Sequence, residues 1–224
     1  MSKFPPALFA EPDPDPDTLA NLGPLRALAG VWEGKKGTDV KPTEDGGASQ
    51  RYVEHWEAQP IDPQMNGPQL LYGLRYHTRI VKPGEVEMYH DQVGYLLWEP
   101  ATGRIIQTLT IPRGQSALAM GKARKTAKRF TLRAVRGRTE NGIVSGAFIE
   151  ENFRTDRWTI TYQLHEDGSW SYNQTTVLKI KGVAKPFRHT DANSMKLVKK
   201  PSRNPMAKAA RKSAKRQAKA AAEG

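Results

Sequence analysis

The stretch from Val86 to Pro112 constrains the fold more than any other part of the chain. It contains two runs of β-branched and aromatic residues, Val93–Trp98 and Ile105–Ile111, separated by Glu99–Gly103, which has a proline near its start and a glycine at its end. That order is typical of a short loop between two antiparallel strands. Side chains of the second run alternate between two faces, and no helical period appears in it. We therefore predict a β protein.

Further runs with the composition of strands follow one another along most of the chain. Turn signals separate many of them, and Glu166-Asp167-Gly168 is a clear hairpin turn after an alternating run. The predicted strands lie near residues 30–35, 50–58, 70–81, 85–90, 93–99, 104–111, 115–121, 129–136, 143–153, 157–165, 169–180 and 193–199. Short strands joined by tight turns favour an up-and-down antiparallel barrel, with a β-sandwich as the alternative. A closed barrel of this size leaves room for one small ligand.

Composition divides the chain into three parts. Residues 1–21 form an acidic, proline-rich arm that is expected to be flexible, residues 22–199 carry the barrel, and residues 200–224 form a basic tail. Regularly spaced leucines after Thr18 predict a short helical segment that Gly23-Pro24 interrupts. This segment either covers one end of the barrel or packs on its outside.

Most of the formal net charge of +12 belongs to the tail. From Lys199 onward there are nine Lys or Arg and one Glu, whereas the preceding 198 residues have 26 Lys or Arg and 22 Asp or Glu. The tail is rich in alanine, lysine and arginine and has no apolar stripe, which predicts either disorder or a helix that forms on an acidic partner. Residues 199–224 could bind nucleic acid or an anionic surface weakly and without sequence preference. They contain no aromatic residue that could stack on bases.

Several classes of protein receive no support. The chain has no cysteine, which excludes a disulfide framework and a thiolate metal site. No apolar run approaches the roughly 18–20 residues of a membrane span, and the N-terminus lacks the apolar core of a signal peptide, so we expect a cytoplasmic protein. The motifs of serine hydrolases, P-loop proteins and dinucleotide-binding sites are absent.

The chain has five histidines, at positions 55, 77, 90, 165 and 189, and no pair has the spacing of a local metal site. His90 precedes Asp91 at a predicted strand boundary, where a hydrogen bond within a turn is the common role of such a pair. His189 lies in a segment that we place in a loop before the last strand. A single imidazole that projects into an apolar cavity is what a haem iron requires for one axial bond. The alternative for His189 is a loop residue without a special role.

Several segments, in the right order, resemble the nitrobindin-like haem-binding β-barrels, which share their shape with fatty-acid-binding proteins and lipocalins. Their match extends over roughly residues 22–199. The similar segments are Leu28–Gly34 for the GxWxGxG opening, Tyr52–Glu54 and Pro68–Tyr76 for the second and third strands, His90–Tyr95 for the start of the central strands, and Pro186–His189 with Met195–Val198 for the axial histidine and the closing strand.

This resemblance implies a ten-stranded barrel that holds haem b at one open end. His189 would bind the ferric iron, and Trp32 and Thr43 would also lie at the cofactor. It further implies that the protein binds nitric oxide and converts peroxynitrite to nitrate, which would make it a peroxynitrite isomerase. The alternative function is that of a lipocalin-like or fatty-acid-binding-like carrier of a small apolar ligand, without haem.

The chain departs from the family pattern at three places. Lys36 stands where the last glycine of the opening motif is expected, and Lys41-Pro42-Thr43 is a loose substitute for the Pro-Thr-Ile that follows. The segment between residues 58 and 69 is also unusually long. These differences affect the contacts at the edge of the haem more than the barrel itself.

Overall fold

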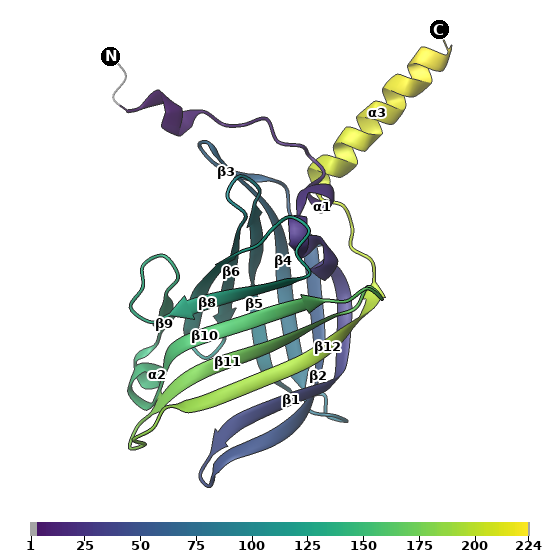
Figure 1. The fold of residues 1–224 in the computed structure, drawn as a ribbon. Coiled ribbons are helices and arrows are strands. Elements are labelled where there is room, and N and C mark those ends of the chain that lie inside the picture. Colours follow the sequence, from purple (N-terminus) through teal and green to yellow (C-terminus); the bar gives the residue numbers. More distant parts are fainter. Residues whose placement is uncertain (1–3, 224) are drawn as a thin grey trace.

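The computed structural model describes residues 4–223, and its main body is a closed antiparallel β-barrel (Figure 1). Each strand of the barrel pairs with the next along the chain, and the pairings of β2 with β4 and of β1 with β12 close the ring. This confirms the predicted ten-stranded up-and-down barrel and excludes the sandwich. The ten strands are β1 (Gly30–Thr43), β2 (Gly46–Pro60), β4 (Gln69–Val81), β5 (Met88–Glu99), β6 (Arg104–Ile111), β7 (Gln115–Lys122), β8 (Arg129–Val135), β10 (Phe153–Leu164), β11 (Trp170–Ile180) and β12 (Phe187–Lys199).

Within residues 4–223, two short strands and five helices lie outside the ring. The strand β3 (Gln64–Asn66) pairs with β4, and β9 (Ile143–Ser145) pairs with β7. The helices are η1 (Pro6–Phe9), α1 (Thr18–Asn21), η2 (Gly23–Leu28), α2 (Ala147–Asn152) and α3 (Pro205–Glu223). None of the helices in residues 4–223 has the length and hydropathy that a membrane crossing requires.

The hairpin predicted within Val86–Pro112 is confirmed as β5 and β6. Glu99 pairs with Arg104 across the turn, and Gly103 takes a positive φ of 68°, which glycine adopts without strain. Ile105, Gln107 and Leu109 are buried, as expected for one face of an alternating strand. The hairpin therefore forms part of the barrel wall and sends one face into its interior.

Four predicted strand bounds were wrong. The predicted strands near 85–90 and 93–99 are the single strand β5, and the first strand continues past residue 35 to Thr43. The pairing of β1 with β2 shifts in register between Gly34 and Gly37, where we predicted the end of that strand, and then continues. The region 143–153 contains the short strand β9 and the helix α2 instead of one strand. The last strand begins at Phe187, so His189 lies within β12 and not in a loop.

The helical segment α1–η2 covers one end of the barrel (Figure 1), which decides between the two arrangements left open above. Leu22, Leu25 and Leu28 are fully buried and belong to the same core as the tryptophans inside the strands. Gly23 has a positive φ of 55°, and a Cβ atom there would lie 2.6 Å from the ring of Trp98. A glycine is therefore required at the point where the segment turns over the barrel.

Below this cover, the interior is filled by packed aromatic rings. Trp170 is 0% exposed, and its ring centroid lies 5.4 Å from that of Trp56 and 5.9 Å from those of Trp32 and Tyr162. Trp56 in turn stacks on Tyr76 at 4.6 Å. Contacts of this kind add to the free energy gained by burying the rings. We call this region, from η2 to Trp170, the closed end of the barrel.

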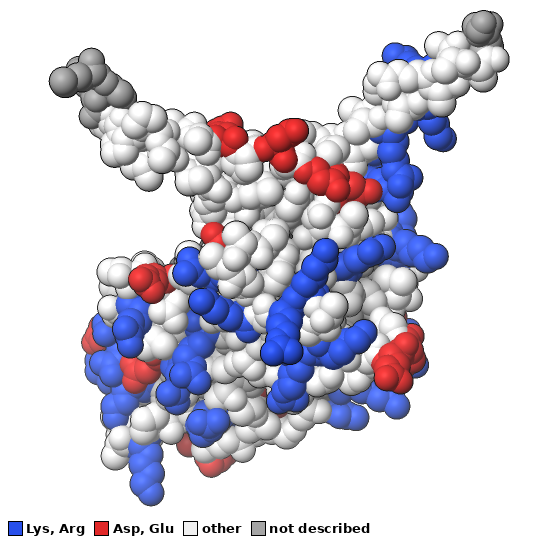
Figure 2. Space-filling model, turned by 45° about the horizontal axis from the view of Figure 1, so that its top comes forward, with Lys and Arg blue, Asp and Glu red and all other residues white. Residues whose placement is uncertain are grey.

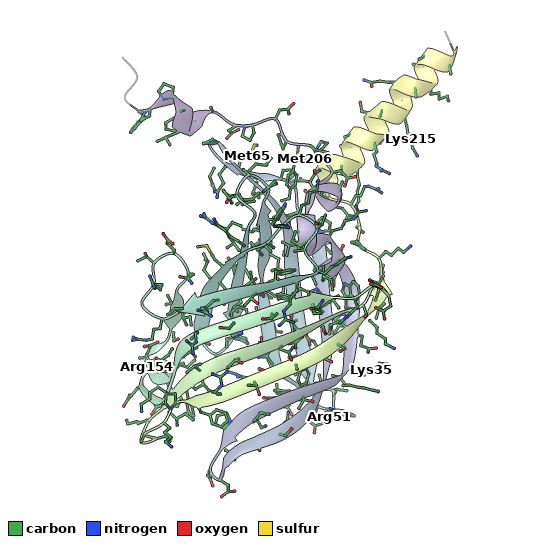
Figure 3. The ribbon with its side chains drawn as sticks, in the orientation of Figure 1. Lys35, Arg51, Met65, Arg154, Met206 and Lys215 are labelled. Atoms are coloured by element: carbon green, nitrogen blue, oxygen red, sulfur yellow. The ribbon has the colours of Figure 1, made fainter. Side chains whose placement is uncertain are left out.

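The basic tail forms the helix α3, which extends away from the barrel (Figure 3). Figure 3 places Met206 at its barrel end and Lys215 farther out. Its start is held by Asn204, which is 1% exposed and whose side chain accepts a hydrogen bond from the backbone of Thr18 and donates to Asp62. Asp62 also accepts a hydrogen bond from the backbone N–H of Met206 at 2.9 Å, satisfying a donor at the helix start. The first turn of α3 is thus attached to the closed end.

Candidate ligand-binding site

The barrel contains a cavity of about 660 Å³ at the end opposite η2. This volume is typical of sites for small molecules and cofactors, which measure roughly 300–1,000 Å³. Its apolar lining comes from several strands and from α2, and includes Ile80, Leu109, Ile111, Ile143, Phe148, Trp158 and Leu178. Its polar lining includes Asp39, Lys41, Tyr89, His90, Gln92, Arg113, Gln174, His189 and Asp191. Phe148 is 71% exposed, so the cavity reaches the surface.

Three neighbouring strands bring the central polar group together. In β12, the side chains of His189 and Asp191 project to the same face because they are two residues apart. Asp39 of β1 is the register partner of Asp191 on one side, and Gln174 of β11 is its partner on the other side. Strand pairing therefore places two carboxylates beside one imidazole.

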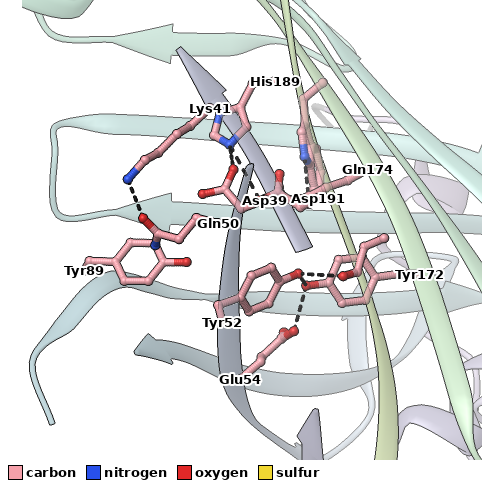
Figure 4. A network of polar contacts seen from close by, with 12 residues as sticks. Asp39, Lys41, Gln50, Tyr52, Glu54, Tyr89, Tyr172, Gln174, His189 and Asp191 are labelled. Carbon is pink, nitrogen blue, oxygen red and sulfur yellow. Dashed lines mark hydrogen bonds and ion pairs between the residues drawn. The ribbon is translucent and has the colours of Figure 1, made fainter. Parts of the chain in front are cut away.

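The imidazole of His189 forms ion pairs with both carboxylates (Figure 4). Its Nε2 lies 2.8 Å from a carboxylate oxygen of Asp39 and 3.6 Å from one of Asp191. Gln174 donates a hydrogen bond of 2.9 Å to the other oxygen of Asp191. The side chain of Asp39 is 5% exposed and that of Asp191 is 12% exposed. The ligand atoms of the three residues lie within 4.8 Å of one another.

The two carboxylates control the protonation of His189. Burial lowers the pKa of the imidazole, but the contacts with Asp191 and Asp39 outweigh this effect and raise the pKa to about 9. The ring is therefore protonated at pH 7 in this arrangement. Its second nitrogen, Nδ1, forms no hydrogen bond with any residue that the structure describes.

Two cationic side chains lie on the same cavity. Lys41 donates a hydrogen bond of 2.5 Å from Nζ to Gln50, and Arg113 donates one to the backbone carbonyl of Tyr89. Burial raises the pKa of Tyr89 to about 12, so its phenol stays neutral. The cavity can thus pair acidic groups of a ligand with Lys41 and Arg113, while its apolar wall receives the rest of the molecule.

A second histidine lines the cavity from the opposite part of the sheet. His90 lies inside β5 and not at a strand boundary, and Asp91 bonds to His77 at 3.0 Å. The interpretation of His90-Asp91 as a hydrogen-bonded turn is therefore wrong. Burial lowers the pKa of His90, so its ring is neutral at pH 7. A neutral imidazole on the cavity wall can donate or accept a hydrogen bond from a bound molecule.

A group of buried polar side chains lies between the cavity and the closed end. Glu54 and Tyr172 of this group line a smaller pocket that shares His90 with the cavity and reaches Trp170 of the closed end. The Tyr172 hydroxyl donates to Glu54 at 2.6 Å, and Asn193 donates to the same carboxylate at 3.2 Å (Figure 4). The hydroxyl oxygens of Tyr172 and Tyr52 are 2.8 Å apart. Burial raises the pKa of Glu54 to about 7, although these hydrogen bonds act in the opposite direction. We call this group the polar floor.

Of the three residues predicted to contact a cofactor, only His189 lines the cavity. Trp32 is 3% exposed and packs against Trp170 in the closed end. Thr43 lies exposed at the end of β1, where its hydroxyl donates to the carbonyl of Gly46 at 3.2 Å. The neighbouring Lys41 and Pro42 do line the cavity.

Sequence reasoning missed Asp39, Asp191, Lys41 and Arg113. One signal was available for Asp191: it follows His189 by two residues, which in a strand means the same face. No local signal identified Asp39, because it comes close only through the pairing of β1 with β12.

The residues present fit a haem group. The cavity combines an apolar wall with an imidazole, which are the two requirements of a haem pocket with one axial histidine. A metal-binding histidine usually donates its other ring N–H to a carboxylate, and His189 has such a carboxylate on one nitrogen and no partner on the other. Lys41 and Arg113 also line the cavity, and such cations can pair with the carboxylates that a haem group carries.

Fold and cavity together define a β-barrel of the kind that encloses one ligand. The profile of the THAP4-like, heme-binding beta-barrel domain matches residues 21–197, and the chain belongs to this family. No curated protein matches the chain.

Solved structures include a barrel of the same kind, Rv2717c from M. tuberculosis. It is 19% identical with a TM-score of 0.55, over 81% of this chain and 98% of that one. A β-barrel-like protein from Brucella abortus, with a domain of unknown function, is 6% identical with a TM-score of 0.22, over 75% of this chain and 97% of that one. The likeness to Rv2717c supports the fold, and the second likeness is too low to support an argument.

Proposed function

We propose that this barrel binds haem b in the 660 Å³ cavity with His189 as the axial ligand, and that the loaded protein binds nitric oxide or isomerises peroxynitrite to nitrate. The observation that carries the proposal is the position of His189, an imidazole on the wall of a cavity with an extensive apolar lining. Family membership supports haem as the ligand, and the resemblance to nitrobindins supports the reaction.

Each part of the cavity has a role in this proposal. Asp39 and Asp191 hold the ring of His189 in place, and the apolar wall keeps water away from the flat faces of the macrocycle. Lys41 and Arg113 pair with the propionates. The bound haem supplies an iron centre for small oxygen and nitrogen ligands, and the protein supplies binding, orientation and access.

Axial binding requires a ring nitrogen with a free lone pair. Because the pKa of His189 is raised to about 9, the ring is protonated at pH 7 and releases one proton when it binds a metal. The carboxylates of Asp39 and Asp191 remain beside the ring and can keep a hydrogen bond to its other nitrogen.

A haem titration followed by absorption spectroscopy tests this assignment. Wild-type protein and the variant His165→Ala should give the same shifted Soret band, because His165 is a surface residue that contacts Ser171 at 2.9 Å near the closed end. His189→Ala should bind haem at least about 100-fold more weakly, because removing only a hydrogen-bond partner of a metal ligand already costs roughly 10–100-fold in affinity. Imidazole added to His189→Gly should restore the spectrum. Identical titrations of wild type and His189→Ala would contradict the assignment and favour a carrier of small apolar ligands.

The proposed reaction needs a separate measurement. Peroxynitrite decay in stopped flow should be faster with the haem-loaded protein, with nitrate as the product, and the acceleration should be lost in His189→Ala. If the loaded protein leaves the decay rate unchanged, the isomerase activity is refuted while haem binding stands.

One observation favours a second candidate, a divalent cation held by Asp39, His189 and Asp191. These three side chains offer two oxygens and one nitrogen within 4.8 Å, and Asp39 and Asp191 are largely shielded from solvent. Calorimetric titration of haem-free protein with Mn²⁺ or Zn²⁺ tests it. Asp191→Asn should remove the binding, whereas Asp45→Asn in the exposed β1–β2 turn should not. Absence of any heat of binding in the wild type would exclude this candidate.

A further inference from the structure

The helix α3 concentrates positive charge on one side. Its six basic residues are Lys208, Arg211, Lys212, Lys215, Arg216 and Lys219. This spacing follows the α-helical period, and at 100° per residue it confines the six side chains to an arc of about 140°. The opposite side carries alanine, serine and glutamine, at positions 209, 210, 213, 214, 217, 220 and 221. We call the first side the cationic face of α3.

The cationic face is presented to solvent. Residues 208–222 are all exposed. Lys208, Arg211, Lys212, Lys215 and Arg216 form no ion pair with an acidic residue in the part of the chain that the structure describes. Like charges three and four residues apart destabilise a helix. The free helix α3 is therefore less stable than it would be if an anionic partner neutralised these charges.

The helix is attached to the barrel and does not start as a free tail. The buried side chain of Asn204 joins Pro16, Thr18 and Asp62, with hydrogen bonds of 2.7–3.2 Å. Ala207, in the first turn, is 2% exposed. This fixes where the helix leaves the barrel, and the exposed Lys199 and Lys200 precede it. Figure 2 shows Lys and Arg running from α3 onto the neighbouring flank of the barrel.

The composition of the helix discriminates between anionic partners. A helix that lies on a membrane inserts large apolar side chains opposite its charges, and the side of α3 opposite the cationic face offers mainly alanine. Single-stranded nucleic acid is bound by stacking on aromatic residues, and α3 contains none. Both observations favour the phosphate backbone of a duplex over a membrane and over single-stranded nucleic acid.

The dimensions of the cationic face fit B-form DNA. From Lys208 to Lys219 the helix rises about 16 Å, a distance along which duplex DNA presents roughly ten phosphates. The major groove of B-DNA, about 12 Å wide, admits an α-helix, whereas that of A-form RNA is too narrow.

We propose that the cationic face of α3 is a docking site for the phosphate backbone of double-stranded DNA, bound without sequence preference. Binding neutralises the like charges along α3 and leaves the cavity at the other end of the barrel free. This surface is independent of the haem site, and neither proposal requires the other.

Fluorescence anisotropy of the full chain with a labelled duplex of about 20 base pairs tests the proposal, at salt concentrations from about 50 to 200 mM. The test variant carries Lys208→Gln, Lys212→Gln and Lys215→Gln, since glutamine keeps helix propensity and removes charge. A control variant carries Lys82→Gln, Lys181→Gln and Lys185→Gln. These exposed lysines lie in the loops β4–β5 and β11–β12, which are at the end of the barrel opposite α3 (Figure 1). Both variants change the net charge equally.

Wild-type affinity should fall as the salt concentration rises. The log–log slope should approach about −4.5, from roughly 0.9 per phosphate neutralised by each of the five basic residues of α3 that form no ion pair. In the test variant the slope should become less steep by about 2.7, which is roughly 0.9 for each of the three charges removed. Its affinity at about 150 mM salt should be at least about tenfold lower than that of the wild type. The control variant should keep the wild-type slope, and the haem titration should be unchanged in both.

Three results would overturn the proposal. Equal loss in the two variants would mean that net charge alone attracts DNA. Equal or tighter binding of a duplex RNA of the same length would refute the assignment to B-form DNA. Binding to phosphatidylserine vesicles that depends on the cationic face, without binding to DNA at about 150 mM salt, would mean that α3 docks on a membrane.

Discussion

At the closed end of the barrel, the inward positions of the strands hold tryptophan and leucine, whereas at the cavity end several of the same strands place histidine, aspartate and glutamine among the apolar residues. β11 carries Trp170 at one end and Gln174 farther along, and β12 carries Met195 at one end and His189 at the other. Both sets of side chains project to the interior. The polar floor, with Glu54 at its centre, lies between them.

This difference teaches that the alternation of a strand indicates only which side chains point inward. Whether an inward residue belongs to a packed core or lines a cavity depends on its position along the barrel axis. The closed end gains stability by burying apolar area, and the cavity end gives up part of that stability to keep polar groups beside empty volume.

Removal of the central ring of the closed end should have the largest effect. Trp170→Ala deletes a fully buried indole that contacts three other aromatic rings, so the free energy of unfolding should fall by about 3–5 kcal/mol. Urea denaturation measures it. The exposed Val144, at 72% exposure, provides the control, since Val144→Ala should change stability by less than about 0.5 kcal/mol. A loss in Trp170→Ala as small as in the control would mean that the aromatic packing does not hold the closed end together.

The polar floor should make stability depend on pH. Because burial raises the pKa of Glu54 to about 7, the folded protein holds this proton more tightly than the unfolded chain does. The stabilisation is complete below the unfolded-state pKa of 4.5 and is lost as the pH rises through about 7, by on the order of 3 kcal/mol. Glu54→Gln should remove this component.

The measurement is urea denaturation from about pH 5 to pH 8. The difference in stability between wild type and Glu54→Gln should grow with pH in favour of the variant. Glu57→Gln changes an exposed carboxylate on the same strand and serves as the control. A difference that stays constant across this range would show that Glu54 is ionised in the folded state throughout.

At the cavity end, Asp39→Asn should weaken haem binding about tenfold, the lower end of the effect of removing a carboxylate partner from a metal-bound histidine. The substitution keeps the size of the side chain but removes the charge that lies 2.8 Å from His189. Haem titration measures the change, with Asp45→Asn as the control. Tighter binding in Asp39→Asn would mean that Asp39 competes with the iron for His189.

The smallest effect should come from the contact that attaches α3 to the closed end. Asn204→Ala removes the hydrogen bonds to Thr18, Pro16 and Asp62, which should cost about 1 kcal/mol and loosen the first turn of α3. Hydrogen exchange at residues 206–210 should become faster, while exchange in the barrel strands stays unchanged. Unchanged exchange in α3 would show that the helix does not depend on this contact.

The fold could be predicted from sequence where alternation and turn chemistry agreed. They agreed in β5 and β6, where apolar residues recur at alternate positions and Gly103 ends the turn. They failed in β12, because its inward residues near the cavity are His189, Asp191 and Asn193, so no apolar alternation marks the strand. The six residues of α2 are too few to show a helical period, which is why the region was predicted as a strand.

Only one residue at the centre of the candidate site, His189, could be predicted from the sequence. His189 could be selected by resemblance and by the chemistry of imidazole, but Asp39 is 150 residues away in sequence and is brought to it by strand pairing alone. Trp32 was selected because it belongs to the opening motif, but its side chain packs against Trp170 in the closed end. Motifs of barrel strands thus locate structural residues as readily as ligand contacts.

The attachment of α3 next to α1 places η1 and α3, the first and last described elements, at the end of the barrel that η2 covers (Figure 1). Anything that grips the protein by α3 therefore orients it, with the cavity facing away from the point of attachment. An immobilised or polymer-bound molecule would keep its ligand entrance accessible to diffusing solutes. The helix α3 and the entrance of the cavity thus lie at opposite ends of the molecule.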